Sequence, residues 1–283
     1  MSSSLTTTDH NRNAAGLTYV YPVLSRRAGG VSIGINFNTN NACNWRCIYC
    51  QVPDLALGAA PDVDLVLLEK ELRFFIKDVL SGDFFDRFAI DSPSRQVKDI
   101  AISGNGEPTS LRHFDQAVRL IGSVAKEMGV FPDAKFVLIT NGSLMHHSSV
   151  QRGLRVLNEL GGEVWFKLDS ATDAGRKLIN NAGLSIDKTA ENLHISSQLC
   201  ATKIQTCLMD YRGMGLREAE KSAYLEFLSR FKQVAGLKGI MVYGLARPSF
   251  QPEAVDLKPL PAEVINDFAQ SIRALGFDVS VNV

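Results

Sequence analysis

The stretch "NACNWRCIYCQVPD" (residues 41–54) places three thiols within eight positions, at Cys43, Cys47 and Cys50. The 283-residue chain has only two further cysteines, Cys200 and Cys207, far along the sequence. Spacings of four and three residues bring the three sulfurs to one side of a short loop, able to converge on one ion or cluster. Structural zinc sites and most iron–sulfur clusters use four protein ligands. Three cysteines therefore predict a centre with one open coordination position, as in catalytic metal sites.

Short apolar runs rich in β-forming residues predict strands at 31–37, 97–103, 135–140, 163–169, 203–209, 238–246 and 278–283. Most of them are nearly continuous in hydrophobicity, which indicates strands covered on both faces. Between them, helical apolar stripes occur at 62–80 and 215–234, with further candidates at 111–128 and 262–275. Such alternation predicts parallel strands joined by right-handed crossovers. We expect an α/β fold, a partial (β/α)6-type TIM-like barrel with parallel strands inside and helices outside.

The composition is that of a soluble globular protein, with 45% hydrophobic and 21% charged residues. The 30 basic and 30 acidic side chains cancel, so the net charge gives no support for a nucleic-acid partner, although it does not exclude one. No apolar run approaches the ~18 residues of a membrane span. We expect a flexible tail at 1–16 and a single catalytic domain at 17–283. Clustered thiols without a disulfide framework predict a cytoplasmic location.

Polar motifs follow several of the predicted strands: "SGNGEPT" (103–109), "TNG" (140–142), "KLDSAT" (167–172) and "YGLARP" (243–248). The carboxyl ends of parallel strands are the rim at which α/β folds bind their ligands. Taken singly, such motifs are ordinary turns, because Gly, Asn and Pro dominate turns. Together with the cysteine loop, which follows the first of these strands, they predict one site at one rim.

The cysteine spacing, with Tyr49 directly before the last cysteine, resembles the signature of the radical S-adenosylmethionine (SAM) superfamily. "SGNGEPT" resembles that family's Gly-Gly-Glu motif, with Asn105 in the place of the first glycine. The resemblance covers roughly residues 30 to 283, judged from the strand pattern. Within the superfamily, the chain is most similar to the Fe–S oxidoreductase group that includes the tRNA wyosine-base synthases. No cysteine precedes Cys43 to hold a second cluster, as in the archaeal synthases, so wyosine synthesis is not the default interpretation.

The resemblance implies a [4Fe-4S] cluster held by Cys43, Cys47 and Cys50, with SAM bound at the fourth iron. A reducing partner of the flavodoxin or ferredoxin type would supply an electron, and SAM would be cleaved to methionine and a 5′-deoxyadenosyl radical. That radical would abstract hydrogen from a substrate that the sequence leaves open: a small molecule, a peptide or protein, or an RNA base. The alternative is a zinc-binding structural or interaction module that uses the same three cysteines.

The resemblance also implies roles for the residues of the strand-end motifs. Glu107 would accept a hydrogen bond from the SAM ammonium, and Gly104 and Gly106 would let the backbone approach the ligand closely. Further cofactor-binding candidates are Tyr49, Asn105, Pro108, Asn141, Asp169 and Ser170.

Two basic residues, Lys167 and Arg247, are the catalytic candidates. Arg247 suits a bidentate grip on a carboxylate or phosphate. Lys167 should share a strand face with Asp169, so it would bind the SAM carboxylate or a substrate anion. The alternative for Lys167 and Asp169 is an internal ion pair, because structural pairs also mimic sites, and the alternative for Arg247 is a solvated charge at the rim.

Overall fold

The computed structural model describes residues 5, 15–25 and 29–283. Its main sheet has eight strands in the spatial order β1-β2-β5-β6-β7-β8-β10-β12. Their bounds are β1 (Val20–Ser25), β2 (Gly30–Asn36), β5 (Val97–Ser103), β6 (Lys135–Thr140), β7 (Glu163–Lys167), β8 (Ala201–Leu208), β10 (Leu237–Gly244) and β12 (Val279–Asn282). All neighbours from β2 to β12 pair in parallel, while β1 pairs antiparallel with β2. The seven parallel strands coincide with the seven predicted runs, so the predicted parallel arrangement is confirmed.

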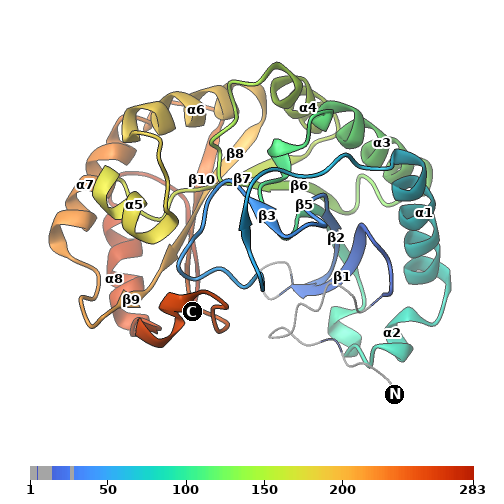
Figure 1. Ribbon diagram of the computed structural model, residues 1–283, viewed down its shortest axis with the longest axis horizontal. Coiled ribbons are helices and arrows are strands. Elements are labelled where there is room, and N and C mark those ends of the chain that lie inside the picture. The colour runs from blue at the N-terminus through green and yellow to red at the C-terminus, as the bar shows by residue number, and fades with distance from the viewer. Residues whose placement is uncertain (1–4, 6–14, 26–28) are drawn as a thin grey trace.

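The helices form an outer arc around the curled sheet (Figure 1). They are α1 (Leu65–Ser81), α2 (Phe84–Arg87), α3 (Phe114–Glu127), α4 (Ser148–Glu159), α5 (Asp173–Asn180), α6 (Ile186–Leu199), α7 (Glu218–Ser229) and α8 (Ala262–Arg273). The helix α1 shows how the sequence builds this arc: Asp64 caps its N-terminus by accepting hydrogen bonds from two backbone N–H groups. The stripe at Leu68, Leu72 and Phe75 then packs inward. The predicted partial TIM-like barrel is confirmed.

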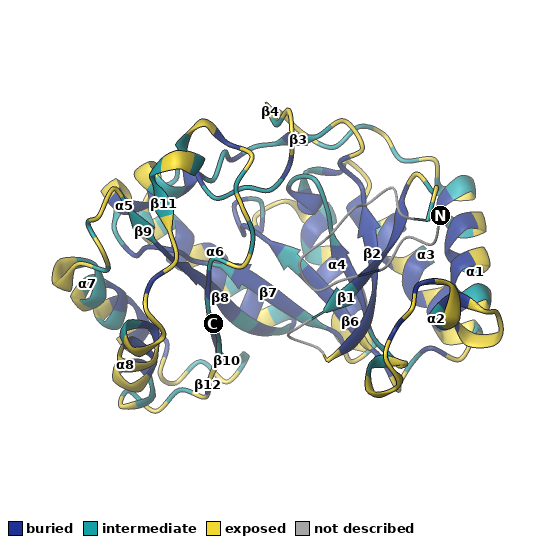
Figure 2. Cartoon of the chain, turned by 90° about the horizontal axis from the view of Figure 1, so that it is seen from below, coloured by how far each residue is buried: buried dark blue, intermediate teal, exposed yellow. Residues whose placement is uncertain are grey.

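The core lies mainly between the convex face of the sheet and the helices, as the dark strands and the yellow outer helix faces of Figure 2 show. The opposite, concave face carries a second, small apolar cluster of Ala101, Val137, Trp165 and Met241. Because side chains alternate along a strand, each strand contributes to both faces. The concave face is therefore partly apolar and open to the interior of the half-barrel.

Shorter elements lie in the segments that connect the main strands and helices. They are the strand pair β3 (Ala42–Cys43) and β4 (Ala56–Leu57), the pair β9 (Asp210–Tyr211) and β11 (Leu257–Lys258), and the 3-10 turns η1 (Ser92–Ser94), η2 (Pro108–Ser110) and η3 (Pro252–Asp256). In the described part of the chain, no helix combines the length and the apolarity needed to cross a membrane. The tail predicted at 1–16 falls outside the described residues, apart from positions 5, 15 and 16.

Candidate functional site

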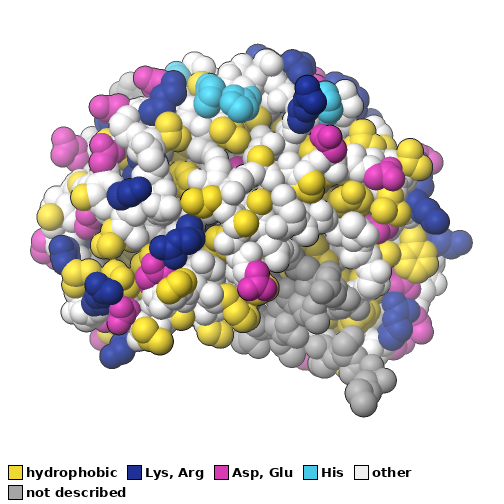
Figure 3. All heavy atoms as spheres, in the orientation of Figure 1, with side chains coloured by type: hydrophobic (Ala, Val, Ile, Leu, Met, Phe, Trp, Pro, Cys, Tyr) yellow, Lys and Arg dark blue, Asp and Glu magenta, His cyan; other side chains and the backbone are white. Residues whose placement is uncertain are grey.

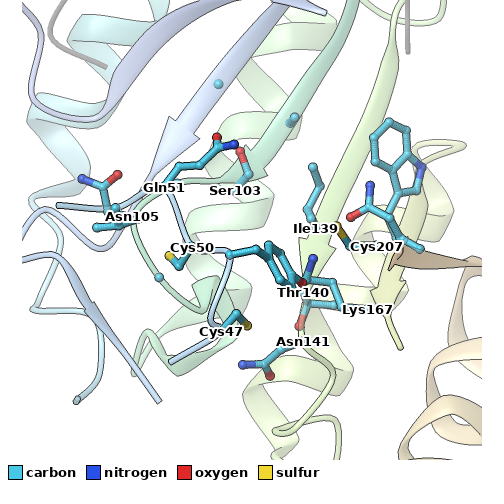
Figure 4. A pocket seen from close by; sticks show the side chains of 18 of the residues that line it. Cys47, Cys50, Gln51, Ser103, Asn105, Ile139, Thr140, Asn141, Lys167 and Cys207 are labelled. Atoms are coloured by element: carbon cyan, nitrogen blue, oxygen red, sulfur yellow. The ribbon is translucent and has the colours of Figure 1, made fainter. Parts of the chain in front are cut away.

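A cavity of about 320 Å³ lies at the carboxyl-end rim of the half-barrel. Of the residues predicted from the sequence, it is lined by Cys43, Cys47, Tyr49, Cys50, Gly104, Asn105, Gly106, Glu107, Asn141, Lys167 and Arg247. Figure 4 shows Cys47 and Cys50 on their loop, across from Lys167, Thr140 and Asn141 at the strand ends. The fold thus gathers motifs that are up to 200 residues apart in the sequence around one space.

The cysteine loop is held in place by segments that come much later in the chain. The Arg46 backbone N–H donates to the Asn180 carbonyl at 3.2 Å, at the end of α5. The Arg46 guanidinium makes two hydrogen bonds to the Glu253 carboxylate, at 2.7 and 2.8 Å. The Cys50 carbonyl accepts a hydrogen bond from the Phe250 N–H at 2.9 Å. The positions of the three sulfurs are therefore set by the whole fold and not by the loop alone.

All three thiols are free. Burial raises the pKa of Cys43 and of Cys47 to about 12, so both are neutral thiols until a positively charged ligand binds. Among the described residues, no three His, Cys, Asp or Glu side chains lie close enough together to hold a single metal ion.

Glu107 is a buried carboxylate, 2% exposed, at the edge of the same cavity. Its Oε1 accepts hydrogen bonds from Thr109 N (3.1 Å) and Thr140 Oγ1 (2.6 Å), and its Oε2 accepts one from Asn141 N (2.6 Å). Burial raises the pKa of Glu107, and these hydrogen bonds oppose that shift. Glu107 forms no salt bridge with any residue of 15–25 or 29–283. A buried carboxylate without a counter-ion favours a cationic ligand.

Gly104 and Gly106, in the turn before Glu107, line the cavity and also allow close contacts within the protein. A Cβ on Gly104, which has φ +124°, would lie 2.3 Å from Asn36 Oδ1. A Cβ on Gly106 would lie 2.0 Å from the carbonyl oxygen of Ala42, the residue before Cys43. Asn105 completes this contact, since its N–H donates to Asn36 Oδ1 at 3.0 Å. The close approach is thus between the turn and the cysteine loop, and it fixes Cys43 next to Glu107.

We expect Gly106→Ala to destabilise the chain by about 1–3 kcal/mol, the range for overpacking a tight contact. The added methyl group meets the Ala42 backbone, which cannot move without shifting Cys43. Denaturant unfolding of the cluster-free chain measures the change. Gly183→Ala is the matched control, because Gly183 is exposed and its Cβ would meet nothing within 4 Å. Equal unfolding free energies for the two variants would contradict the packing argument.

Lys167 is the last residue of β7, and its ammonium reaches into the cavity. Its Nζ donates to the Tyr243 hydroxyl at 3.0 Å and lies 5.0 Å from the centre of the Tyr49 ring. Burial acts to lower the pKa of Lys167, but its neighbours, Tyr243 and Asp169 foremost, outweigh burial and raise the pKa. The lysine is therefore charged at neutral pH.

Asp169 is not among the residues that line the cavity, although its carboxylate acts on the pKa of Lys167. The strand β7 ends at Lys167, so the alternation that the prediction used stops before Asp169. Asp169 Oδ2 accepts hydrogen bonds from the Tyr49 hydroxyl (2.5 Å) and Asn180 Nδ2 (2.7 Å), and Oδ1 accepts one from Cys207 N (2.8 Å). The salt bridges of the described residues include none between Asp169 and Lys167. Asp169 instead ties the cysteine loop to β8 and α5.

Other predicted residues also have partners within the protein. Ser170 does not line the cavity, and its hydroxyl donates to Glu220 Oε2 on α7 at 2.6 Å. Pro108 opens the turn η2 and is likewise not part of the cavity lining. The Asn141 amide donates to Asn44 Oδ1 at 2.8 Å, which anchors the cysteine loop.

Several residues that line the cavity were not predicted from the sequence: Ser103, Thr140, Trp165, Gln205, Cys207, Tyr243 and Asn282. Gln205 carried a readable signal, because it is a polar residue inside the apolar run 203–209. Cys207 is buried and also borders the cavity.

Comparison with known proteins gives a match to the family model of the radical SAM superfamily over residues 37–218. The solved structure of TYW1 with a lysine–pyruvate adduct bound is similar, with a TM-score of 0.59 and 16% identity, covering 86% of this chain and 73% of that one. A radical SAM methyltransferase from Sphaerobacter thermophilus gives a TM-score of 0.59 and 15% identity, covering 93% and 68%. At these identities, the likeness to the two structures extends to the fold.

A curated relative, the GTPase Obg of Brachyspira hyodysenteriae (strain ATCC 49526 / WA1), is 25% identical over 170 residues. The match covers 59% of this chain but 21% of that protein, so the chain spans about a fifth of that relative's length. The sequence contains no Gly-x4-Gly-Lys-Ser/Thr phosphate-binding loop, the motif that cradles nucleotide phosphates.

Proposed function

The chain belongs to the radical SAM superfamily, and we propose that it cleaves SAM reductively at a [4Fe-4S] cluster held by Cys43, Cys47 and Cys50. The observation that supports this most is that three free thiols and the buried Glu107, which has no counter-ion among the described residues, border the same cavity. When bound and reduced, the cluster supplies the electron that splits SAM into methionine and a 5′-deoxyadenosyl radical, which takes a hydrogen atom from a substrate.

The protein's own residues would position SAM in this cavity. Glu107 would accept a charge-assisted hydrogen bond from the SAM ammonium. This contact would also compensate the charge of the buried carboxylate. Tyr49, whose hydroxyl is fixed by Asp169, would present its ring to the ligand. Arg247 lines the same cavity and would hold an anionic group of SAM or of the substrate. Together these contacts would orient the reacting groups and exclude water.

The electron would come from a flavodoxin or ferredoxin type of protein in the cytoplasm. On the face shown in Figure 3, basic and acidic side chains are mixed and the coloured residues form no large basic patch. This face therefore does not favour a nucleic-acid substrate. The zinc-module alternative is less favoured, because no histidine in the described part of the chain lines the cavity.

Anaerobic purification tests the proposal directly. We expect a brown protein with about four irons per chain that binds SAM, since a cubane cluster with three cysteine ligands leaves one iron open. A colourless protein with one zinc per chain would instead establish the alternative.

The variant Glu107→Gln should bind SAM more weakly by about 1–3 kcal/mol, the range for hydrogen bonds to charged groups, while the cluster is retained. The change keeps the shape of the side chain but removes the charge that faces the ammonium. Titration calorimetry under anaerobic conditions gives the affinity, and iron analysis gives the cluster content. The control is Glu191→Gln, at an exposed glutamate on α6. An unchanged SAM affinity would mean that Glu107 does not bind SAM and that "SGNGEPT" is an ordinary turn.

A further inference from the structure

Two polar side chains stand side by side on the concave face of the sheet, one on each of two neighbouring strands. Lys167 on β7 and Gln205 on β8 are register partners, and both line the cavity. Gln205 is only 2% exposed, yet its Nε2 has no hydrogen-bond partner among the described residues. Leaving a buried donor unsatisfied costs about 1–3 kcal/mol. An oxygen acceptor from a ligand in the cavity would remove that cost.

Lys167 brings a positive charge to the same place. An ammonium has three N–H donors, and in the described structure one of them is used by the Tyr243 hydroxyl. No carboxylate of the described residues forms a salt bridge with Lys167. The pair therefore offers to a group in the cavity an ammonium, whose charge the nearby Asp169 carboxylate helps to stabilise, and one neutral N–H donor.

Part of the concave surface beside this pair is apolar. Trp165 lies two residues before Lys167 on β7, with its side chain on the same face. It forms the concave-face cluster with Ala101, Val137 and Met241. A ligand that fits has an oxygen anion at the rim end and an apolar part directed toward the interior of the barrel.

We propose that Lys167 and Gln205 form the subsite that binds a carboxylate group of the substrate. The proposal rests on the proposed function only in calling that ligand the substrate. The ammonium and the amide provide one N–H donor for each of the two oxygens of a carboxylate, and the neighbouring apolar cluster suits the carbon chain of such a ligand. An RNA base carries no carboxylate, so the substrate class is a small carboxylic acid or a peptide carboxylate.

The probe for this subsite is propionate, with propionamide as a neutral molecule of the same shape. Calorimetric and thermal-shift titrations use the full chain, both cluster-loaded with SAM and cluster-free. We expect propionate to bind to the wild type in preference to propionamide. Lys167→Met and Gln205→Leu should each weaken propionate binding about tenfold or more, as expected for loss of a charge-assisted hydrogen bond. The SAM affinity of Gln205→Leu should stay within about twofold of wild type.

Matched control variants lie on the surface. Lys177→Met and Gln198→Leu make the same chemical changes at exposed positions and should leave propionate binding unchanged. Gln205→Glu keeps the shape of the buried side chain in case Gln205→Leu fails to fold. It should abolish propionate binding, because the new carboxylate takes the lysine as its partner and repels the probe.

Three outcomes would overturn the proposal. The first is no preference of the wild type for propionate over propionamide or over inorganic phosphate. The second is equal propionate affinity in wild type and Gln205→Leu. The third is a loss of SAM affinity in both cavity variants as large as the loss of propionate affinity, which would assign the pair to SAM. Propionate binding by the cluster-free chain is independent of SAM chemistry, so a wild type that fails to bind iron or SAM refutes the proposed function separately.

Discussion

Replacing Cys47 with alanine should abolish the iron–sulfur cluster. The protein would then offer two thiolates, and a cubane held by two thiolates is poorly retained. The Cys47 sulfur accepts a hydrogen bond from Asn180 Nδ2 at 3.3 Å. The other two cysteines of the loop are themselves ligands in the proposed cluster, so neither can replace it. Iron content and the visible thiolate-to-iron absorbance after anaerobic reconstitution measure the loss.

The two remaining cysteines are the controls for this experiment. Cys200 is 3% exposed and donates to the Gly162 carbonyl, at the opposite ends of the strands, so Cys200→Ser should keep the full iron content. Cys207→Ser is the stricter control, because Cys207 borders the cavity itself. Complete iron loss in Cys200→Ser or Cys207→Ser would contradict a cluster held by three cysteines.

The sequence was sufficient to predict the parallel strands, because a strand buried on both faces is a nearly continuous apolar run. It did not predict β1, where Pro22 interrupts the run; the strand is tolerated because it lies at the edge of the sheet. It also did not predict α6, whose inward face buries the polar residues Thr189, Asn192 and Ser196. A helix that buries polar groups has a weak apolar stripe and escapes a periodicity search.

The position of the rim motifs was predictable from the parallel strands, because parallel strands carry their carboxyl ends to one edge of the sheet. What each side chain contacts there was not. Asp169 turned to Tyr49 and Cys207 because β7 ended two residues earlier than the apolar pattern implied. Gln205 was visible as a polar residue inside an apolar run, but the lack of a partner for its amide appears only when the neighbouring strands are in place.

Wild-type protein supplied with dithionite and SAM should release 5′-deoxyadenosine slowly even without its substrate, whereas Cys43→Ala should release none. Among the three proposed ligands, Cys43 is the one that adjoins the Glu107 turn: it follows Ala42, whose carbonyl oxygen fills the space beside Gly106. Without the Cys43 thiol the chain would not retain the cluster. Both the electron source and the iron that would bind SAM beside Glu107 would then be lost. Chromatography of quenched reactions measures the product.

The control that separates these two effects is Glu107→Gln, which should keep its iron and produce 5′-deoxyadenosine in proportion to the SAM it still binds. Saturating SAM should therefore restore product in Glu107→Gln but not in Cys43→Ala, because only the first variant retains the electron source. A wild type that carries its full iron content and binds no SAM would contradict the proposed function. Product formation by Cys43→Ala at the wild-type rate would remove Cys43 from the ligand set, since a cluster without that thiolate would then still deliver its electron to SAM.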